Sequence, residues 1–222
     1  MNTYMSLKDH VYNYIADQIA DGTLMPEKKI DEKKICSELN ISRTPVREAL
    51  IQLSSEGILH NVPRKGFVVP SLSEKKAAEL YSVIGALDGL AASLACPAMT
   101  AKHLQDMEFY ASAMDVAIES SNYDMYHMQQ ILFHSTYIEE CGNDILIETL
   151  GKLKMKFLKK SHIVNDSRSE SAIQAILCRT NREHREIIRL FSEKDADSLA
   201  SYMQKVHWAP DLAHLEIIEE KN

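Results

Sequence analysis

The apolar positions in the first third of the chain predict three short helices. The first spans residues 6–21 and stops at Gly22, the second spans 31–39, and Asn40 supplies the turn toward a third helix. Each helix has one apolar stripe, formed in order by Leu7, Val11, Ile15 and Ile19, by Ile35 and Leu39, and by Val46, Ala49, Leu50 and Leu53. Two short helices joined by a tight turn predict a helix-turn-helix.

The third helix has the features of a DNA recognition helix. Ser42 is placed as its N-cap, and Pro45 falls in the first turn, where a missing N–H costs nothing. Opposite the apolar stripe, Arg43, Thr44 and Arg47 project near the N-terminus, where the helix dipole favours phosphate and an Arg can reach a guanine edge. The pattern therefore predicts a helix that lies in the major groove.

A basic hairpin follows this helix. The β-branched segments 58–62 and 66–69 are separated by Pro63, Arg64 and Lys65. We expect Arg64 and Lys65 to reach phosphate or the minor groove, with Lys33 as a further phosphate contact. The first 70 residues thus predict a winged helix-turn-helix domain.

From Ser73 onward the pattern is almost wholly helical. Pro210 ends or kinks the last helix, and the apolar periodicity predicts helices near 73–95, 100–119, 122–141, 143–159, 169–191 and 194–209. The fold class is therefore mainly α: a winged helix-turn-helix over 1–70 and an antiparallel all-α bundle of six or seven helices over 71–222. The core of such a bundle is a common place for ligand and metal sites built from facing helices.

The composition places the acidity in the second domain. The net charge is −7, but residues 1–70 hold nine basic and nine acidic residues, so the excess lies entirely in 71–222. DNA affinity would thus rest on local basic contacts. Without a signal-peptide or membrane-span pattern, a cytoplasmic protein is expected. The widely spaced cysteines favour buried thiols over a zinc ribbon or disulfides: Cys36, Cys96, Cys141 and Cys178.

The first third resembles the winged helix of GntR-family bacterial transcription regulators. The resemblance rests on 31–39, on 42–50 and on 64–67. It implies that Arg43, Thr44, Arg47 and Gly66 contact operator DNA, with Lys33 at a position usually held by Arg. A homodimer on palindromic DNA, with half-sites about 10 bp apart, is then expected.

The rest resembles the FCD ligand-binding domain of the FadR-type subgroup. The resemblance implies that His134, His184 and His207 hold a divalent metal, such as Zn²⁺ or Ni²⁺, with Gln130 at a fourth position where relatives carry Asp or Asn. The alternative is that the histidines hydrogen-bond an anionic ligand directly or fill the pocket.

The family resemblance also implies a small carboxylate effector that releases a repressor. Tyr81, Tyr137 and Arg185 are the expected effector contacts, while Ile84 stands where related regulators commonly carry Arg. The lysines on the fourth bundle helix are expected to form a solvated face, since their spacing covers several sides: Lys152, Lys154, Lys156, Lys159 and Lys160.

Two alternative functions would use the same three histidines. The first is a metal-dependent enzyme, which the absence of known catalytic motifs disfavours. Its nearest carboxylate, Glu183, is expected to point about 100° away from His184 on the helix. The second is a regulator that senses metal alone, whose DNA affinity would change with metal and not with a carboxylate.

Overall fold

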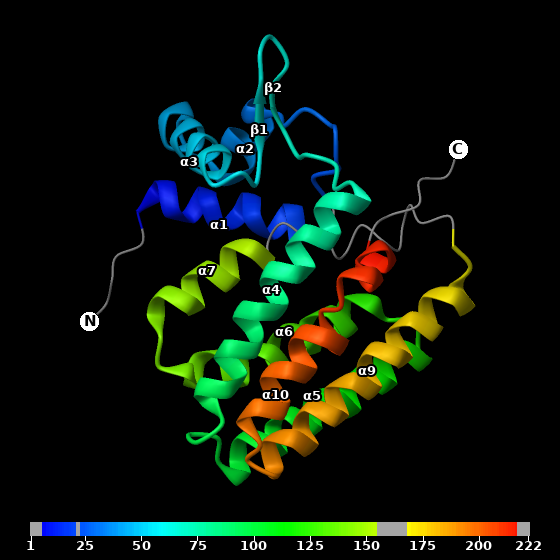
Figure 1. Cartoon of the computed structure of the whole chain (residues 1–222). Helices are drawn as coiled ribbons and strands as arrows, with labels where there is room; N and C mark the ends of the chain where they lie inside the picture. The colour runs from blue at the N-terminus through cyan, green and yellow to red at the C-terminus, as the bar shows by residue number, and fades with distance from the viewer. Residues whose placement is uncertain (1–5, 21–22, 155–167, 217–222) are drawn as a thin grey trace. The chain divides into compact units, whose positions relative to one another are not determined.

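The computed structural model describes residues 6–20, 23–154 and 168–216, which divide into two compact units between Leu72 and Ser73. The first unit contains three helices and a hairpin, and the second is helical (Figure 1). This is the mainly α architecture that the sequence predicts.

The first unit begins with α1 (Leu7–Ala20), α2 (Glu32–Leu39) and α3 (Arg43–Ser55). Asp31 caps α2, because its side chain accepts hydrogen bonds from two backbone N–H groups of the first turn. Asn40 ends α2 in the left-handed conformation with φ 52°, which makes the tight turn into α3. The helix-turn-helix is therefore built by local capping.

One apolar core joins these helices. Its buried residues include Val11, Ile15, Ile19, Ile35, Val46, Ala49, Leu50 and Leu53. Two details differ from the predicted pattern. Leu7 lies at the start of α1 and is 62% exposed, so the stripe begins at Val11. Ser42 has the extended backbone of an N-cap, but its side chain makes no capping hydrogen bond.

The wing is an antiparallel hairpin of β1 (His60–Val62) and β2 (Gly66–Val68), in which Val62 pairs with Gly66. The first strand is shorter than the predicted 58–62. The reason is that the N–H groups of Ile58 and Leu59 bond to the carbonyl of Leu53 and continue the helix end.

The second unit contains α4 (Glu74–Ala95), α5 (Ala101–Glu119), α6 (Tyr123–Ile138), the 3₁₀ turn Glu139–Cys141, α7 (Asp144–Lys154), α9 (Glu170–Ser192) and α10 (Ala196–Tyr202). Helix α5 packs against α6 and α9, while α4 packs against α6, α7 and α10. The predicted continuation of α7 to residue 159 lies outside the described residues, as do Lys156, Lys159 and Lys160.

The last predicted helix, 194–209, is not a single α-helix. Helix α10 continues as a π-helical turn, Met203–His207, and a 3₁₀ segment, Pro210–Glu216, follows. A π turn is wider than an α turn and is frequent at functional sites. Periodicity alone did not predict it, because a one-residue widening leaves the apolar pattern nearly unchanged.

One helix, α4, is long and apolar enough to cross a membrane by length and composition alone. It also carries the buried carboxylate of Asp88 and packs against three neighbouring helices. These features are those of a core helix of the second unit.

Candidate functional site

The outer face of α3 carries the residues predicted to read DNA. Arg43, Thr44 and Arg47 are exposed, whereas Val46 and Leu50 on the opposite face are fully buried. The packing of α3 therefore leaves its N-terminal polar residues free to enter a groove.

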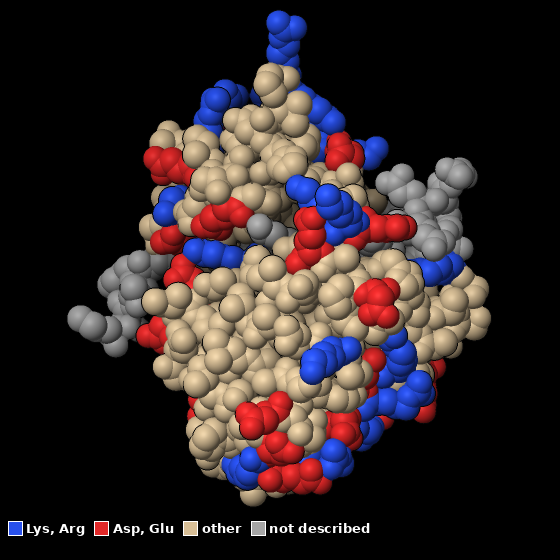
Figure 2. All heavy atoms as spheres, viewed as in Figure 1, with Lys and Arg blue, Asp and Glu red and all other residues tan. Residues whose placement is uncertain are grey.

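The wing adds basic side chains to the same unit. Arg64 and Lys65 are exposed at the tip of the hairpin, where Figure 2 shows Lys and Arg gathered. The ammonium group of Lys65 donates to the carbonyl oxygen of Glu27 at 3.0 Å. Lys33 is exposed in the first turn of α2, and Gly66 begins β2 with φ 92°.

A second site lies inside the helical unit, where three histidines converge. His134 comes from α6, His184 from α9 and His207 from the π-helical turn. One ring nitrogen of each lies within 4.8 Å of the others, and all three side chains are buried. The structure thus brings together the three residues that the sequence predicted as metal ligands.

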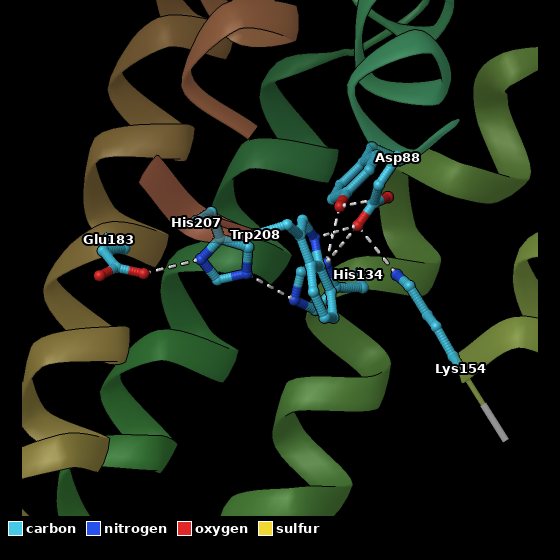
Figure 3. Close-up of polar contacts among 7 residues, drawn as sticks. Asp88, His134, Lys154, Glu183, His207 and Trp208 are labelled. Atoms are coloured by element: carbon cyan, nitrogen blue, oxygen red, sulfur yellow. Dashed lines mark hydrogen bonds and ion pairs between the residues drawn. The ribbon is translucent and has the colours of Figure 1, made fainter. Parts of the chain in front are cut away.

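Each histidine has an oxygen neighbour at its Nδ1. The distance is 2.7 Å from His134 to the hydroxyl of Tyr137, 3.3 Å from His184 to Oδ1 of Asn181, and 3.0 Å from His207 to Oε2 of Glu183. On the opposite ring edge, Nε2 of His134 lies 3.4 Å from Nε2 of His207. Glu183 and His207 are drawn in Figure 3.

Glu183 contacts the histidine cluster through His207, although it was expected to point about 100° away from His184. It does point away from His184 along α9, but the π-helical turn places His207 on the side to which Glu183 points. The carboxylate is nearly buried and also lies 3.5 Å from Nε of Arg179. A helical wheel of α9 alone does not show that Glu183 meets a residue of another element.

A buried carboxylate organises the other side of the cluster. Oδ1 of Asp88 accepts a hydrogen bond from the hydroxyl of Tyr137 at 2.9 Å. Oδ2 accepts from Nε1 of Trp208 at 2.8 Å and from Nζ of Lys154 at 3.0 Å (Figure 3). Burial, followed by the charge and hydrogen bond of Asp88, raises the pKa of Tyr137 well above its ordinary value. Tyr137 therefore remains a proton donor to Asp88.

The expectation that the lysines of this helix form a solvated face is wrong for Lys154. Its side chain is 23% exposed, and its ammonium group also lies 5.3 Å from the ring centroid of Trp208. Lys152, two residues earlier, does pair at the surface, with Glu148. The spacing of the lysines could not show that one of them faces a buried acid on another helix.

The predicted effector residues do not all come together. Tyr137 lies in the cluster, and the buried ring of Tyr81 packs edge-on against Trp208, with centroids 5.0 Å apart. Arg185 instead lies on the surface, where it pairs with Glu108 and Asp115 of α5. Adjacent residues of an α-helix point to different faces, so Arg185 does not share the face of α9 on which His184 lies.

The two residues that depart from the family pattern, Gln130 and Ile84, are both buried. Gln130 is buried one turn before His134, and its side chain makes no hydrogen bond to the three histidines in the described part of the chain. Ile84 is fully buried on α4, one turn before Asp88.

Sequence reasoning missed Asp88, Lys154, Asn181 and Trp208. A signal existed for Asp88, because it is the one charged residue between positions 80 and 101. A lone carboxylate within an apolar helix is rarely buried without partners. Nothing comparable marks Asn181, which lies among other polar residues of α9.

The donor set fits a divalent metal ion. Three imidazole nitrogens from three elements are buried and adjacent, and imidazole suits Zn²⁺, Ni²⁺ and Cu²⁺. Oxygen acceptors behind metal-binding histidines are the usual outer-shell arrangement, and Tyr137, Asn181 and Glu183 occupy those positions.

Comparison with known proteins agrees with both parts of the structure. Residues 7–69 match the family of "Bacterial regulatory proteins, gntR family", and residues 79–207 match the FCD domain. The chain belongs to the gntR family of bacterial regulatory proteins. It is a transcription regulator with a helix-turn-helix domain, which implies DNA binding, and an FCD domain, which implies a small-molecule effector.

Two relatives illustrate the similarity of this gntR-family chain. The "Uncharacterized HTH-type transcriptional regulator YdhC" of Bacillus subtilis is 26% identical over 95% of this chain and 91% of its own length. The "Gluconate operon transcriptional repressor" of the same species is 34% identical over 62% of this chain and 56% of its own length.

Solved structures show the same fold. E. coli McbR/YncC superposes with a TM-score of 0.81 at 21% identity, covering 95% of this chain and 97% of its own. A putative GntR regulator from Rhodococcus has a TM-score of 0.71 at 19% identity, covering 94% and 96%.

Proposed function

We propose that this regulator is a homodimeric, cytoplasmic repressor that a small organic acid releases from palindromic operator DNA, with a divalent metal ion held by His134, His184 and His207. The observation that carries the proposal is the convergence of three buried imidazoles in an FCD domain that accompanies a helix-turn-helix. The gluconate operon transcriptional repressor among the relatives supports the repressor role.

DNA recognition is divided between α3 and the wing. Arg47 and Arg43 would read base edges from α3, while Arg64 and Lys65 would contact phosphate or the minor groove. In a symmetric dimer the same contacts occur twice, so the operator is two-fold.

The histidine site would hold the metal and complete the effector site. Three neutral imidazoles leave the metal with its full positive charge and with an open coordination position, to which a carboxylate or hydroxyl oxygen can bind. The effector changes DNA affinity if it binds the DNA-bound and released arrangements with different affinities.

The DNA part is tested by selecting binding sequences from random duplexes and measuring affinity at fixed salt. Arg47→Ala should weaken the selected site by about 1–3 kcal/mol and relax one base preference. Lys65→Ala should weaken all sequences alike. Wild-type affinity in both variants would show that another surface contacts DNA.

The metal part is tested by elemental analysis of the purified, untagged chain. Stoichiometric metal that is lost in His184→Ala and retained in His214→Ala, an exposed histidine, supports the site. No metal in the wild type after incubation with Zn²⁺ or Ni²⁺ contradicts it.

The effector part is tested by adding sugar acids and other small carboxylic acids to the protein–DNA complex. Release by a carboxylate at constant metal supports the proposal. DNA affinity that follows metal and ignores every carboxylate would support metal-only sensing instead. Hydrolytic activity in a metal-loaded sample would favour the enzyme.

A further inference from the structure

We infer that Tyr137, Asn181 and Glu183 fix all three histidines as Nδ1–H tautomers, so that three Nε2 lone pairs face one another and accept a divalent metal ion. These residues act as positioning residues and are not ligands themselves. The inference rests on the proposed metal site, and it follows from which hydrogen-bond partners can donate.

The tautomer of His207 follows from its partner. Nδ1 of His207 lies 3.0 Å from Oε2 of Glu183, and an ionised carboxylate can only accept hydrogen bonds. His207 must therefore donate from Nδ1. Its Nε2 is then directed toward His134.

The tautomer of His134 follows from a chain of three groups. The hydroxyl of Tyr137 has one hydrogen, and it donates this hydrogen to Oδ1 of Asp88 at 2.9 Å. The same oxygen lies 2.7 Å from Nδ1 of His134, so it accepts a hydrogen bond there. Asp88 thus sets the tautomer of His134 through a phenol.

The tautomer of His184 follows from the orientation of an amide. Nδ2 of Asn181 donates to the carbonyl of Ala111 at 2.9 Å and to Oδ1 of Asp115 at 2.5 Å. Both amide hydrogens are used on α5, which leaves Oδ1 of Asn181 facing Nδ1 of His184 at 3.3 Å. His184 therefore also donates from Nδ1.

These tautomers leave the Nε2 atoms, on the opposite edges of the rings, without hydrogens. Nε2 of His134 and Nε2 of His207 are 3.4 Å apart, and in these tautomers neither carries a hydrogen to share. Each Nε2 can then act as a metal ligand, because a neutral imidazole binds a metal through the nitrogen that carries no hydrogen. A divalent ion with a preference for nitrogen ligands fits these atoms, and the outer acceptors raise the basicity of the rings. Zn²⁺ and Ni²⁺ belong to this class.

The tautomers can be read directly by long-range ¹H–¹⁵N NMR correlation spectra of the metal-free full chain. We expect Nδ1 to carry the proton in His134, His184 and His207 of the wild type. In Glu183→Ala, His207 should lose this preference, because its acceptor is gone. A wild-type spectrum in which Nε2 carries the proton in His207 would overturn the inference.

Metal affinity gives a second, independent readout. Zn²⁺ binding is measured by competition with a chelating dye. Glu183→Ala should weaken it by about 10–100-fold, a range typical of outer-shell losses. Glu183→Gln should weaken it less, because its amide oxygen still accepts from His207. Glu186→Ala is the matched control on α9. The carboxylate of Glu186 pairs with Arg189, so this variant should bind Zn²⁺ with unchanged affinity.

The outcomes separate the inference from the proposed function. If the wild type binds Zn²⁺ and Glu183→Ala binds it equally well, the positioning role is wrong although the metal site stands. If the wild type binds neither Zn²⁺ nor Ni²⁺, the metal site is wrong, and the NMR spectra still decide the tautomers. Circular dichroism of each metal-free variant checks that the fold is retained.

Discussion

Nζ of Lys154, at the end of α7, lies 3.0 Å from Oδ2 of Asp88, a fully buried carboxylate in the middle of α4. The two residues are 66 positions apart in the chain, and the pair joins two helices beside the histidine cluster. Lys154 balances a charge that would otherwise be costly inside the unit. The buried carboxylate beside the cluster is therefore paired with a lysine that was not among the predicted site residues.

Lys154→Met should destabilise the metal-free chain by about 1–3 kcal/mol, measured by urea unfolding, because Asp88 loses a charged hydrogen-bond donor but retains two neutral ones. Adding Asp88→Asn should recover part of this loss, since the buried charge is removed. The control is Lys152→Met, whose exposed pair with Glu148 should be worth less than about 1 kcal/mol. Equal effects of the two lysine variants would contradict a buried ion pair.

The helical unit also depends on a close approach between α4 and α10. A Cβ added at Gly89 would lie 2.8 Å from the backbone oxygen of Ala200 and 3.3 Å from its Cα. At Gly85 it would lie 2.9 Å from Cβ of Trp208. These glycines allow the π-helical turn to bring His207 against α4.

Gly89→Ala should therefore push α10 outward and destabilise the unit by about 1–3 kcal/mol, despite the better helix propensity of Ala. Metal affinity should fall as well, because His207 follows α10. The matched control is Gly151→Ala on α7, where an added Cβ meets nothing within 4 Å. That variant should gain up to about 1 kcal/mol. Thermal unfolding of both variants measures the difference.

The wing places a strained residue at its tip. Arg64 has φ 65°, a left-handed conformation that costs a non-glycine residue roughly 1 kcal/mol. Arg64→Gly should raise stability by about this amount and weaken binding to every DNA sequence, because a phosphate contact is lost. Arg64→Ala should weaken DNA binding equally without the gain in stability, since Ala keeps the strain. Unfolding curves and DNA titrations of the two variants test this. Unchanged DNA affinity in both would exclude Arg64 from the interface.

The local features of the fold could be predicted from the sequence. Helices α2 and α3, the tight turn at Asn40 and the basic hairpin follow from capping residues and periodicity within a few positions. The three histidines were also identified, because the family resemblance fixes their spacing. These predictions needed no knowledge of which helices touch.

The surroundings of the histidines could not be predicted in this way. Glu183 and Lys154 reach the site only because α9 meets the π-helical turn and α7 meets α4. Arg185 is next to His184 in sequence, yet it faces α5. Contacts between helices decide which polar side chain is buried, and periodicity within one helix carries no such information.

If His134, His184 and His207 bind Zn²⁺ in the folded chain only, free Zn²⁺ at 100 times its dissociation constant should stabilise the chain by about 2.7 kcal/mol, and excess chelator should remove this gain. In His184→Ala the chelator should make little difference, because two imidazoles hold the ion weakly. His214→Ala should behave as the wild type, since that exposed ring lies outside the cluster. Unfolding that ignores both Zn²⁺ and chelator in the wild type would show that the three rings do not form a metal site.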